Sequence, residues 1–164
     1  PLLLYNIPAF TSEIHFDTIM KLLATGLYAG VKDSSGRMAD FRRMKAVKKQ
    51  APFTLLTGDD RIFAEARAEG ADGGVSGVAS AVPELMVALE RAVGAGAEQI
   101  QIQLEARLQE FIARSEGFPF PLAIKEAVAL RGVRMGPPAP ERMDAFRKWF
   151  RAWLPVVLKE AAGG

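Results

Sequence analysis

A lysine stands at the end of a short apolar run and is followed at once by turn residues. The segment reads Leu27-Tyr28-Ala29-Gly30-Val31-Lys32-Asp33-Ser34-Ser35-Gly36. We interpret Tyr28–Lys32 as a strand, so that the amine lies at the mouth of a sheet beside an apolar interior. Apolar surroundings disfavour the charged form of an amine, and a neutral amine is a nucleophile toward carbonyl carbons. Lys32 is therefore a candidate catalytic residue, and the alternative is a solvated lysine at a strand end.

Three further apolar runs end on residues that could serve the same site. These ends are Tyr5-Asn6, Gly58-Asp59-Asp60 and Val75-Ser76-Gly77. In a closed barrel the carboxyl ends of parallel strands meet at one pocket. A tyrosine beside a reactive lysine could relay protons and bind a substrate carboxylate. The alternatives are a tyrosine packed in the core and aspartates that cap the next helix.

Strands alternate with helices through the first part of the chain. Strands are predicted at Leu2–Asn6, Tyr28–Lys32, Phe53–Thr57 and Gly73–Ser76. Helices are predicted from the N-cap Asp17 to Thr25, over Ala39–Gln50 and Arg61–Glu69, and from Pro83 onward. This alternation indicates four βα units with parallel strands. The strands are almost continuously apolar, which is typical of a parallel sheet covered on both faces.

The strand signal disappears after Gly94, and helical spacing continues. Helices are predicted at Ala97–Ser115, Pro121–Arg131 and Pro140–Lys159, and Pro155 is expected to kink or end the last one. We therefore divide the chain into residues 1–94, which carry the lysine, and residues 95–164, a helical extension. Four units make half of an eight-fold barrel. An open sheet of flavodoxin type is the competing architecture, although no phosphate loop follows the first strand.

Composition excludes several kinds of protein. The 164 residues carry a net charge of +2, with no cysteine and a single histidine, so disulfides, thiolate catalysis and a multi-histidine zinc site are excluded. No broad basic surface predicts nucleic-acid binding, and no apolar run is long enough to span a membrane. The lack of cysteine fits a reducing compartment, and we expect a cytoplasmic protein. Opening within a strand at Pro1 favours a fragment or a processed product.

Four segments taken together resemble the dihydrodipicolinate synthase / N-acetylneuraminate lyase family. They are Tyr5-Asn6-Ile7-Pro8, Val31-Lys32-Asp33-Ser34-Ser35-Gly36, Thr57-Gly58-Asp59-Asp60 and Gly70-Ala71-Asp72-Gly73-Gly74-Val75-Ser76. The resemblance covers essentially the whole chain. It implies an α/β fold, the (β/α)8 TIM barrel, of which this chain carries about the last four units and a three-helix tail. It also implies class I, Schiff-base lyases that use pyruvate without a cofactor and are usually homotetrameric.

The resemblance assigns roles to individual positions. Lys32 matches the lysine that forms the imine with pyruvate, and Tyr5 matches the proton-relay tyrosine. Val75 matches the position whose backbone lies beside the bound pyruvyl group. The remaining substrate-binding positions are Ser34, where some lyases place a hydroxyl on the substrate, and Gly58 and Asp60, which line the distal substrate site.

Departures from the family pattern narrow the expected substrate. Phe10 stands where synthases that use aspartate semialdehyde carry an arginine, and a phenyl ring cannot bind that carboxylate. Arg61 and Gly77 replace an acidic residue and a serine of the sialic-acid lyases. The resemblance therefore favours the branch that joins pyruvate to an aldehyde to give a 2-keto-3-deoxy sugar acid or a hydroxy-oxo acid. Dihydrodipicolinate synthesis is the alternative.

The family's first half is not found in this sequence. There the family carries a Gly-Thr-Thr segment that binds the pyruvate carboxylate, and a further tyrosine that reaches across a subunit interface. A second hypothesis is therefore a non-catalytic half-barrel that acts as an assembly module. A third is a barrel enzyme with a phosphate ligand, because Gly73–Gly77 could cradle a phosphate.

Overall fold

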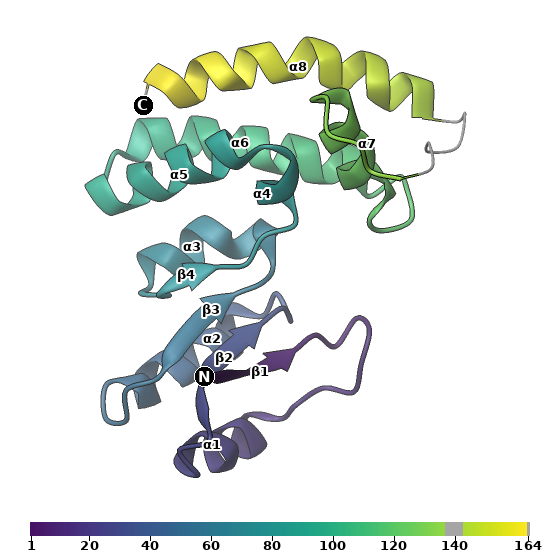
Figure 1. Cartoon of the computed structure of the whole chain (residues 1–164). Coiled ribbons are helices and arrows are strands. Elements are labelled where there is room, and N and C mark those ends of the chain that lie inside the picture. The colour runs from purple at the N-terminus through teal and green to yellow at the C-terminus, as the bar shows by residue number, and fades with distance from the viewer. Residues whose placement is uncertain (137–142, 164) are drawn as a thin grey trace. The chain divides into compact units, whose positions relative to one another are not determined.

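The computed structural model describes residues 1–136 and 143–163 (Figure 1). The chain forms two compact units, Pro1–Ser76 and Gly77–Gly164, which we term the sheet unit and the helical unit. The sequence pattern instead predicts a boundary after residue 94, between the barrel units and the helical tail, and that boundary stays a prediction. The start of the predicted helix at Pro140 lies outside the described residues.

The sheet unit contains four parallel strands in the order β1-β2-β3-β4. The strands are β1 (Leu2–Asn6), β2 (Tyr28–Asp33), β3 (Thr54–Thr57) and β4 (Gly73–Gly74). The intervening helices are α1 (Phe16–Ala24), α2 (Met38–Lys48), the 3-10 helix η1 (Asp60–Ile62) and α3 (Phe63–Ala68). Each strand pairs with the next one along the chain, as in a barrel. A flavodoxin-type sheet would instead exchange its first two strands.

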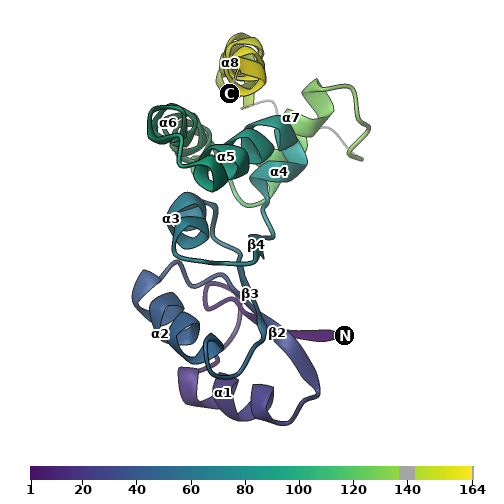
Figure 2. The same cartoon turned by 90° about the vertical axis from the view of Figure 1, so that its left-hand side faces the viewer.

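One face of this sheet forms the core of the sheet unit, because side chains alternate along each strand. Leu4, Val31 and Leu55 point to the helices and are buried with Ile19 of α1 and Phe41 of α2. Figure 2 shows α2 and α3 on one side of the strands.

The opposite face, termed the front face, carries Leu3 and Tyr5, which are 42% and 47% exposed. This differs from the expected cover on both faces. In a closed barrel the front face is the interior, and the described half leaves it open.

Two details of the sheet unit differ from the sequence prediction. His15, in an extended conformation, is the N-cap of α1, and Asp17 lies in the first turn instead. Asp17 still favours this helix end through its negative charge. The helix predicted at Arg61–Glu69 begins as η1, which Asp59 caps, and continues as α3.

The helical unit consists of α4 (Val78–Ala81), α5 (Pro83–Ala95), α6 (Glu98–Ser115), α7 (Leu122–Leu130) and α8 (Asp144–Gly163). The short helix α4 escaped prediction, whereas Pro83 opens α5 as predicted. Pro155, predicted to kink or end the last helix, does not end it, because α8 continues to Gly163; the kink stays a prediction. Pro155 and Arg151 are both exposed, so water can solvate the Arg151 carbonyl that the proline leaves without a donor.

An aromatic cluster between α6 and α8 forms the core of the helical unit. Phe111 packs against Phe146, Phe150 and Trp153 at centroid distances of 5.6–6.4 Å, and all four are buried. These rings therefore serve packing within the helical unit. None of the helices in the described ranges is both long enough and apolar enough to cross a membrane.

Candidate active site

Tyr5 and Lys32 lie side by side on the front face. They are register partners at the carboxyl ends of β1 and β2, so their side chains leave the same face of the sheet. Lys32 Nζ lies 4.0 Å from the centroid of the Tyr5 ring. The hydrogen bond with Lys32 lowers the pKa of the Tyr5 phenol below its ordinary value, although burial acts in the opposite direction.

Ser34 and Gly58 complete the immediate surroundings of Lys32. The Ser34 hydroxyl is buried and lies near the Tyr5 phenol, whose pKa it also lowers, but within the described residues it forms no hydrogen bond of normal geometry. A Cβ built on Gly58 would lie 2.0 Å from Ser34 Oγ and 2.5 Å from Lys32 Cε. Both distances are far inside van der Waals contact. Glycine at position 58 therefore provides the space that the lysine side chain and the serine hydroxyl occupy.

The carboxylate of Asp59 caps η1. It accepts hydrogen bonds from the Arg61 backbone N–H at 2.9 Å and from Arg61 Nε at 3.0 Å. Burial by itself raises the pKa of Asp59, but these hydrogen bonds outweigh it and hold the pKa below its ordinary value. Asp59 is therefore a helix cap, which was one of the two alternatives for this residue in the sequence.

The remaining predicted residues lie at the same edge of the sheet. Asp60 is in the first turn of η1, just beyond the end of β3. The Val75 N–H donates to the Thr57 carbonyl at 2.9 Å, which places Val75 directly after β4. The structure thus brings Tyr5, Lys32, Ser34 and Gly58 into contact distance, with Asp60 and Val75 on the same carboxyl edge.

A buried polar pair lies on the opposite face, directly behind Tyr5 and Lys32. Asn6 Nδ2 donates to Asp33 Oδ1 at 2.6 Å, and the two residues are only 3% and 2% exposed. Asn6 Oδ1 accepts from the Ile14 N–H at 3.0 Å, and Asp33 Oδ2 accepts from the Ser35 hydroxyl at 2.6 Å. Sequence reasoning did not single out this pair. Its only signal was a polar residue at the end of each of two otherwise apolar strands.

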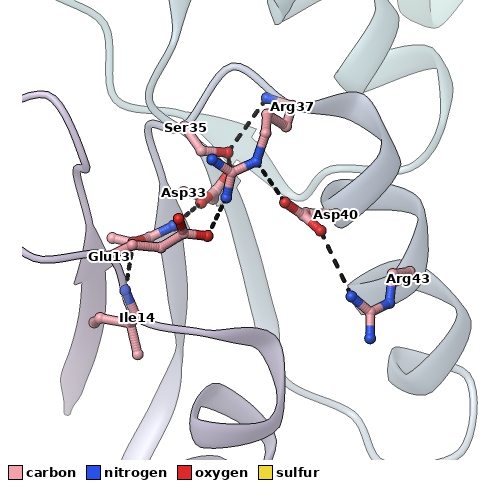
Figure 3. A network of polar contacts seen from close by, with 8 residues as sticks. Glu13, Ile14, Asp33, Ser35, Arg37, Asp40 and Arg43 are labelled. Atoms are coloured by element: carbon pink, nitrogen blue, oxygen red, sulfur yellow. Dashed lines mark hydrogen bonds and ion pairs between the residues drawn. The ribbon is translucent and has the colours of Figure 1, made fainter.

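An ion-pair network extends outward from this pair (Figure 3). Arg37 donates to Asp40 at 2.6 Å and also pairs with Glu13, and Arg43 lies 3.7 Å from Asp40. A cavity of about 290 Å³ lies beside the network. Its lining includes Asn6 and Asp33 but neither Tyr5 nor Lys32, so it is on the helix side of the sheet and separate from the lysine.

Consecutive parallel βα units with reactive residues at the strand ends define a barrel of the TIM type, present here in part. The sequence profile of the Dihydrodipicolinate synthetase family matches residues 1–148. The chain belongs to this family and comprises about the last four βα units of its barrel and the helical tail, as the sequence predicted.

Individual relatives agree with this assignment. An uncharacterised DapA-like lyase of Halobacterium salinarum is 33% identical over 138 residues, which are 84% of this chain and 45% of the relative. The structure of YagE from E. coli K12, solved in complex with pyruvate, is 27% identical with a TM-score of 0.80 and covers 96% of this chain and 56% of that one. The sialic acid aldolase of Ruminococcus gnavus shares the fold, with 22% identity, a TM-score of 0.82 and coverage of 96% and 56%. The chain thus spans about half the length of the curated relatives it matches.

Proposed function

We propose that this chain carries the Schiff-base machinery of a class I aldolase or lyase and that Lys32 is its nucleophile. The observation that carries the proposal is the position of Lys32 Nζ 4.0 Å from the Tyr5 ring, in a space that Gly58 leaves open. The pyruvate complex of YagE supports pyruvate or another 2-oxo acid as the carbonyl substrate. No cofactor is needed for this chemistry.

The proposed reaction uses Lys32 and Tyr5 in succession. The neutral amine of Lys32 adds to the 2-oxo carbon, and the resulting carbinolamine loses its hydroxyl group as water to give a protonated imine. Tyr5 donates the proton that this departure requires. Because Lys32 lowers the pKa of its phenol, Tyr5 releases this proton more readily than an isolated tyrosine would.

The protonated imine then acts as an electron sink. It withdraws electrons from the adjacent carbon, which forms a bond to an aldehyde through an enamine or releases the aldehyde in the reverse reaction. Hydrolysis of the imine frees Lys32. Every proton and electron pair in these steps comes from the lysine, the substrate, the phenol or water.

Substrate binding is proposed for four further residues. The Ser34 hydroxyl is buried near the Tyr5 phenol without a hydrogen bond of normal geometry, and a buried hydroxyl normally forms one, so a substrate oxygen bound beside Tyr5 is a fitting partner. The Val75 backbone would lie beside the pyruvyl group, and Gly58 and Asp60 would line the distal part. Phe10 favours a 2-keto-3-deoxy sugar acid or hydroxy-oxo acid over dihydrodipicolinate synthesis.

Two observations favour a second candidate, a half-barrel that acts as an assembly module. The chain spans about half the length of its relatives, and its front face exposes Leu3. In both cases we propose a cytoplasmic protein that works as a homo-oligomer, a tetramer when the barrel is complete.

Trapping of the imine tests the proposed function. The protein is incubated with pyruvate and borohydride, and its intact mass is measured. We expect one reduced pyruvyl adduct on the wild-type chain, loss of the adduct in Lys32→Ala, and retention in Lys21→Ala, an exposed lysine of α1. A folded wild-type sample without adduct would exclude imine chemistry in this chain and leave the assembly module.

A further inference from the structure

We propose that the buried Asn6–Asp33 pair is the positioning element that holds Tyr5 and Lys32 together. The inference rests on the proposed function, because it assigns to this pair the geometry of the imine site. Neither residue is proposed to touch substrate. Each acts through the residue that precedes it on its strand.

The placement follows from strand geometry. Successive side chains on a strand point to opposite faces, so Asn6 lies behind Tyr5 and Asp33 behind Lys32. The two pairs are consecutive rungs of one ladder, Tyr5 opposite Lys32 and Asn6 opposite Asp33. A bond that closes the rear rung therefore also fixes the spacing and tilt of the front rung.

The backbone of β1 alone holds this register weakly. Within the described sheet β1 is an edge strand with β2 as its single neighbour, and its register to β2 shifts between Leu2 and Leu3. At the other end of β1, the Ser34 N–H donates to the Asn6 carbonyl at 2.8 Å. The 2.6 Å side-chain bond lies at this same end, where the reactive residues are.

The chemistry of the pair makes it hard to displace. Asp33 is 2% exposed, and its carboxylate oxygens accept from two neutral donors, Asn6 and Ser35. Removing one donor leaves a buried carboxylate short of a partner, which is among the more costly changes in a protein interior. Asn6 in turn holds the Ile14 N–H, so the pair also anchors the loop before α1.

The phenol of Tyr5 provides a readout that does not depend on activity. The sequence contains two tyrosines, Tyr5 and Tyr28, so a Tyr28→Phe background leaves Tyr5 as the single phenol. Its titration is then followed by phenolate absorbance. The pKa of Tyr5 is lowered first by its hydrogen bond with Lys32 and also by a hydrogen bond with Ser34, so the titration midpoint reports whether the phenol stays beside these two residues at the end of β2.

The experiment compares three changes in this background. Asn6→Ala breaks the pair, and we expect the Tyr5 midpoint to rise toward that of a free phenol. We also expect pyruvyl adduct formation to slow by roughly 10- to 100-fold, as misplaced catalytic groups do. The double variant Asn6→Asp, Asp33→Asn exchanges the two residues. The new amide at position 33 can donate to the new carboxylate at position 6, and oxygens remain to accept from the Ile14 N–H and the Ser35 hydroxyl, so we expect a wild-type Tyr5 midpoint and a wild-type rate of adduct formation. Thr57→Val removes a different buried polar group from the same face, and it should change neither the Tyr5 midpoint nor the rate of adduct formation.

The outcomes separate this inference from the proposed function. If the wild-type chain forms no adduct, the function fails, but the Tyr5 midpoint still tests the pair. A folded Asn6→Ala variant with an unchanged midpoint overturns the inference. If Asn6→Ala does not fold, the exchange variant decides: a wild-type midpoint supports the pair as positioning element, and a free-phenol midpoint in a folded protein overturns it.

Discussion

Gly58 shows how a residue without a side chain can define a reactive site. Its backbone N–H donates to the Asp33 carbonyl at 2.7 Å, which holds the Cα against Lys32 and Ser34. The backbone conformation of Gly58 does not require glycine, but the space that a Cβ would need is occupied by Lys32 and Ser34. A methyl group at this position would have to displace either the end of the lysine side chain or the serine hydroxyl.

We therefore predict that Gly58→Ala forms the pyruvyl adduct much more slowly than the wild type while remaining folded. The added Cβ meets Lys32 Cε at 2.5 Å, so the amine moves away from Tyr5. Borohydride trapping followed over time measures the rate, and circular dichroism checks the fold. Gly73→Ala is the matched control, because a Cβ there meets Leu56 at an ordinary 3.5 Å. Equal rates in both variants would contradict the spacing argument.

At this scale, the sequence predicted Lys32 and Tyr5 as catalytic residues but did not predict that Asn6 and Asp33 form a buried pair behind them. A lysine after an apolar run is visible in one segment of the chain. The meaning of the buried pair depends on the register between two strands whose paired residues are 27 positions apart. Only the fold supplies that register.

Among the elements, η1 depends on a single cap. Asp59 closes the turn after β3 by accepting from Arg61, and its side chain is 9% exposed. The cap lies between Gly58, which adjoins the lysine, and Asp60, which is proposed to line the distal site. Loss of this cap would loosen the part of the carboxyl edge that carries both residues.

We predict that Asp59→Ala lowers the free energy of unfolding by about 0.5–2 kcal/mol, as the loss of an N-cap does. Urea titration of both proteins measures the difference. The folded pKa of Asp59 lies below its ordinary value because the hydrogen bonds from Arg61 outweigh the effect of burial. The cap therefore contributes fully above the ordinary pKa of 3.8 and loses its effect as the pH falls through the lower folded pKa. A difference between wild type and variant that stays constant through this acid range would contradict the assignment.

Local sequence signals predicted most elements well, including Pro83 at the start of α5. They failed where burial or solvent decides. Pro155 costs α8 one hydrogen bond, but its exposed position lets water compensate, and packing of the buried Trp153 and Val157 on either side holds the helix together. The helix α4 has only four residues, too few to show a helical period in the sequence, so the sequence pattern did not predict it.

At the scale of the whole molecule, the open front face is the main feature of the sheet unit. Leu2 and Leu3 of the edge strand β1 are exposed, and an edge strand with free backbone groups is a template for pairing with another chain. The parallel direction of the strands was predictable from the alternation of strands and helices, but their order was not, because a flavodoxin-type sheet shows the same alternation. The exposure of the front face was not predictable either, because almost continuously apolar strands are typical of a sheet that is covered on both faces.

We predict that the chain by itself associates with other copies as its concentration rises. Sedimentation velocity over a concentration series measures this, and Leu3→Glu should weaken it by placing a charge on the front face. Val87→Glu is the matched control, since Val87 is 48% exposed on α5 and Leu3 is 42% exposed. A chain that sediments as a monomer at every concentration would contradict the prediction.

The two rungs at the ends of β1 and β2 also limit how this protein can change by mutation. Because reactive and structural residues alternate one by one, inserting or deleting a single residue within either strand would exchange the faces. Tyr5 or Lys32 would turn into the core, and Asn6 or Asp33 would turn out of it. Descendants of this sequence can therefore vary in the length of the segments that follow the two strands, whereas the residue types at these strand ends are constrained. Changes in strand length are accessible to them only in steps of two residues.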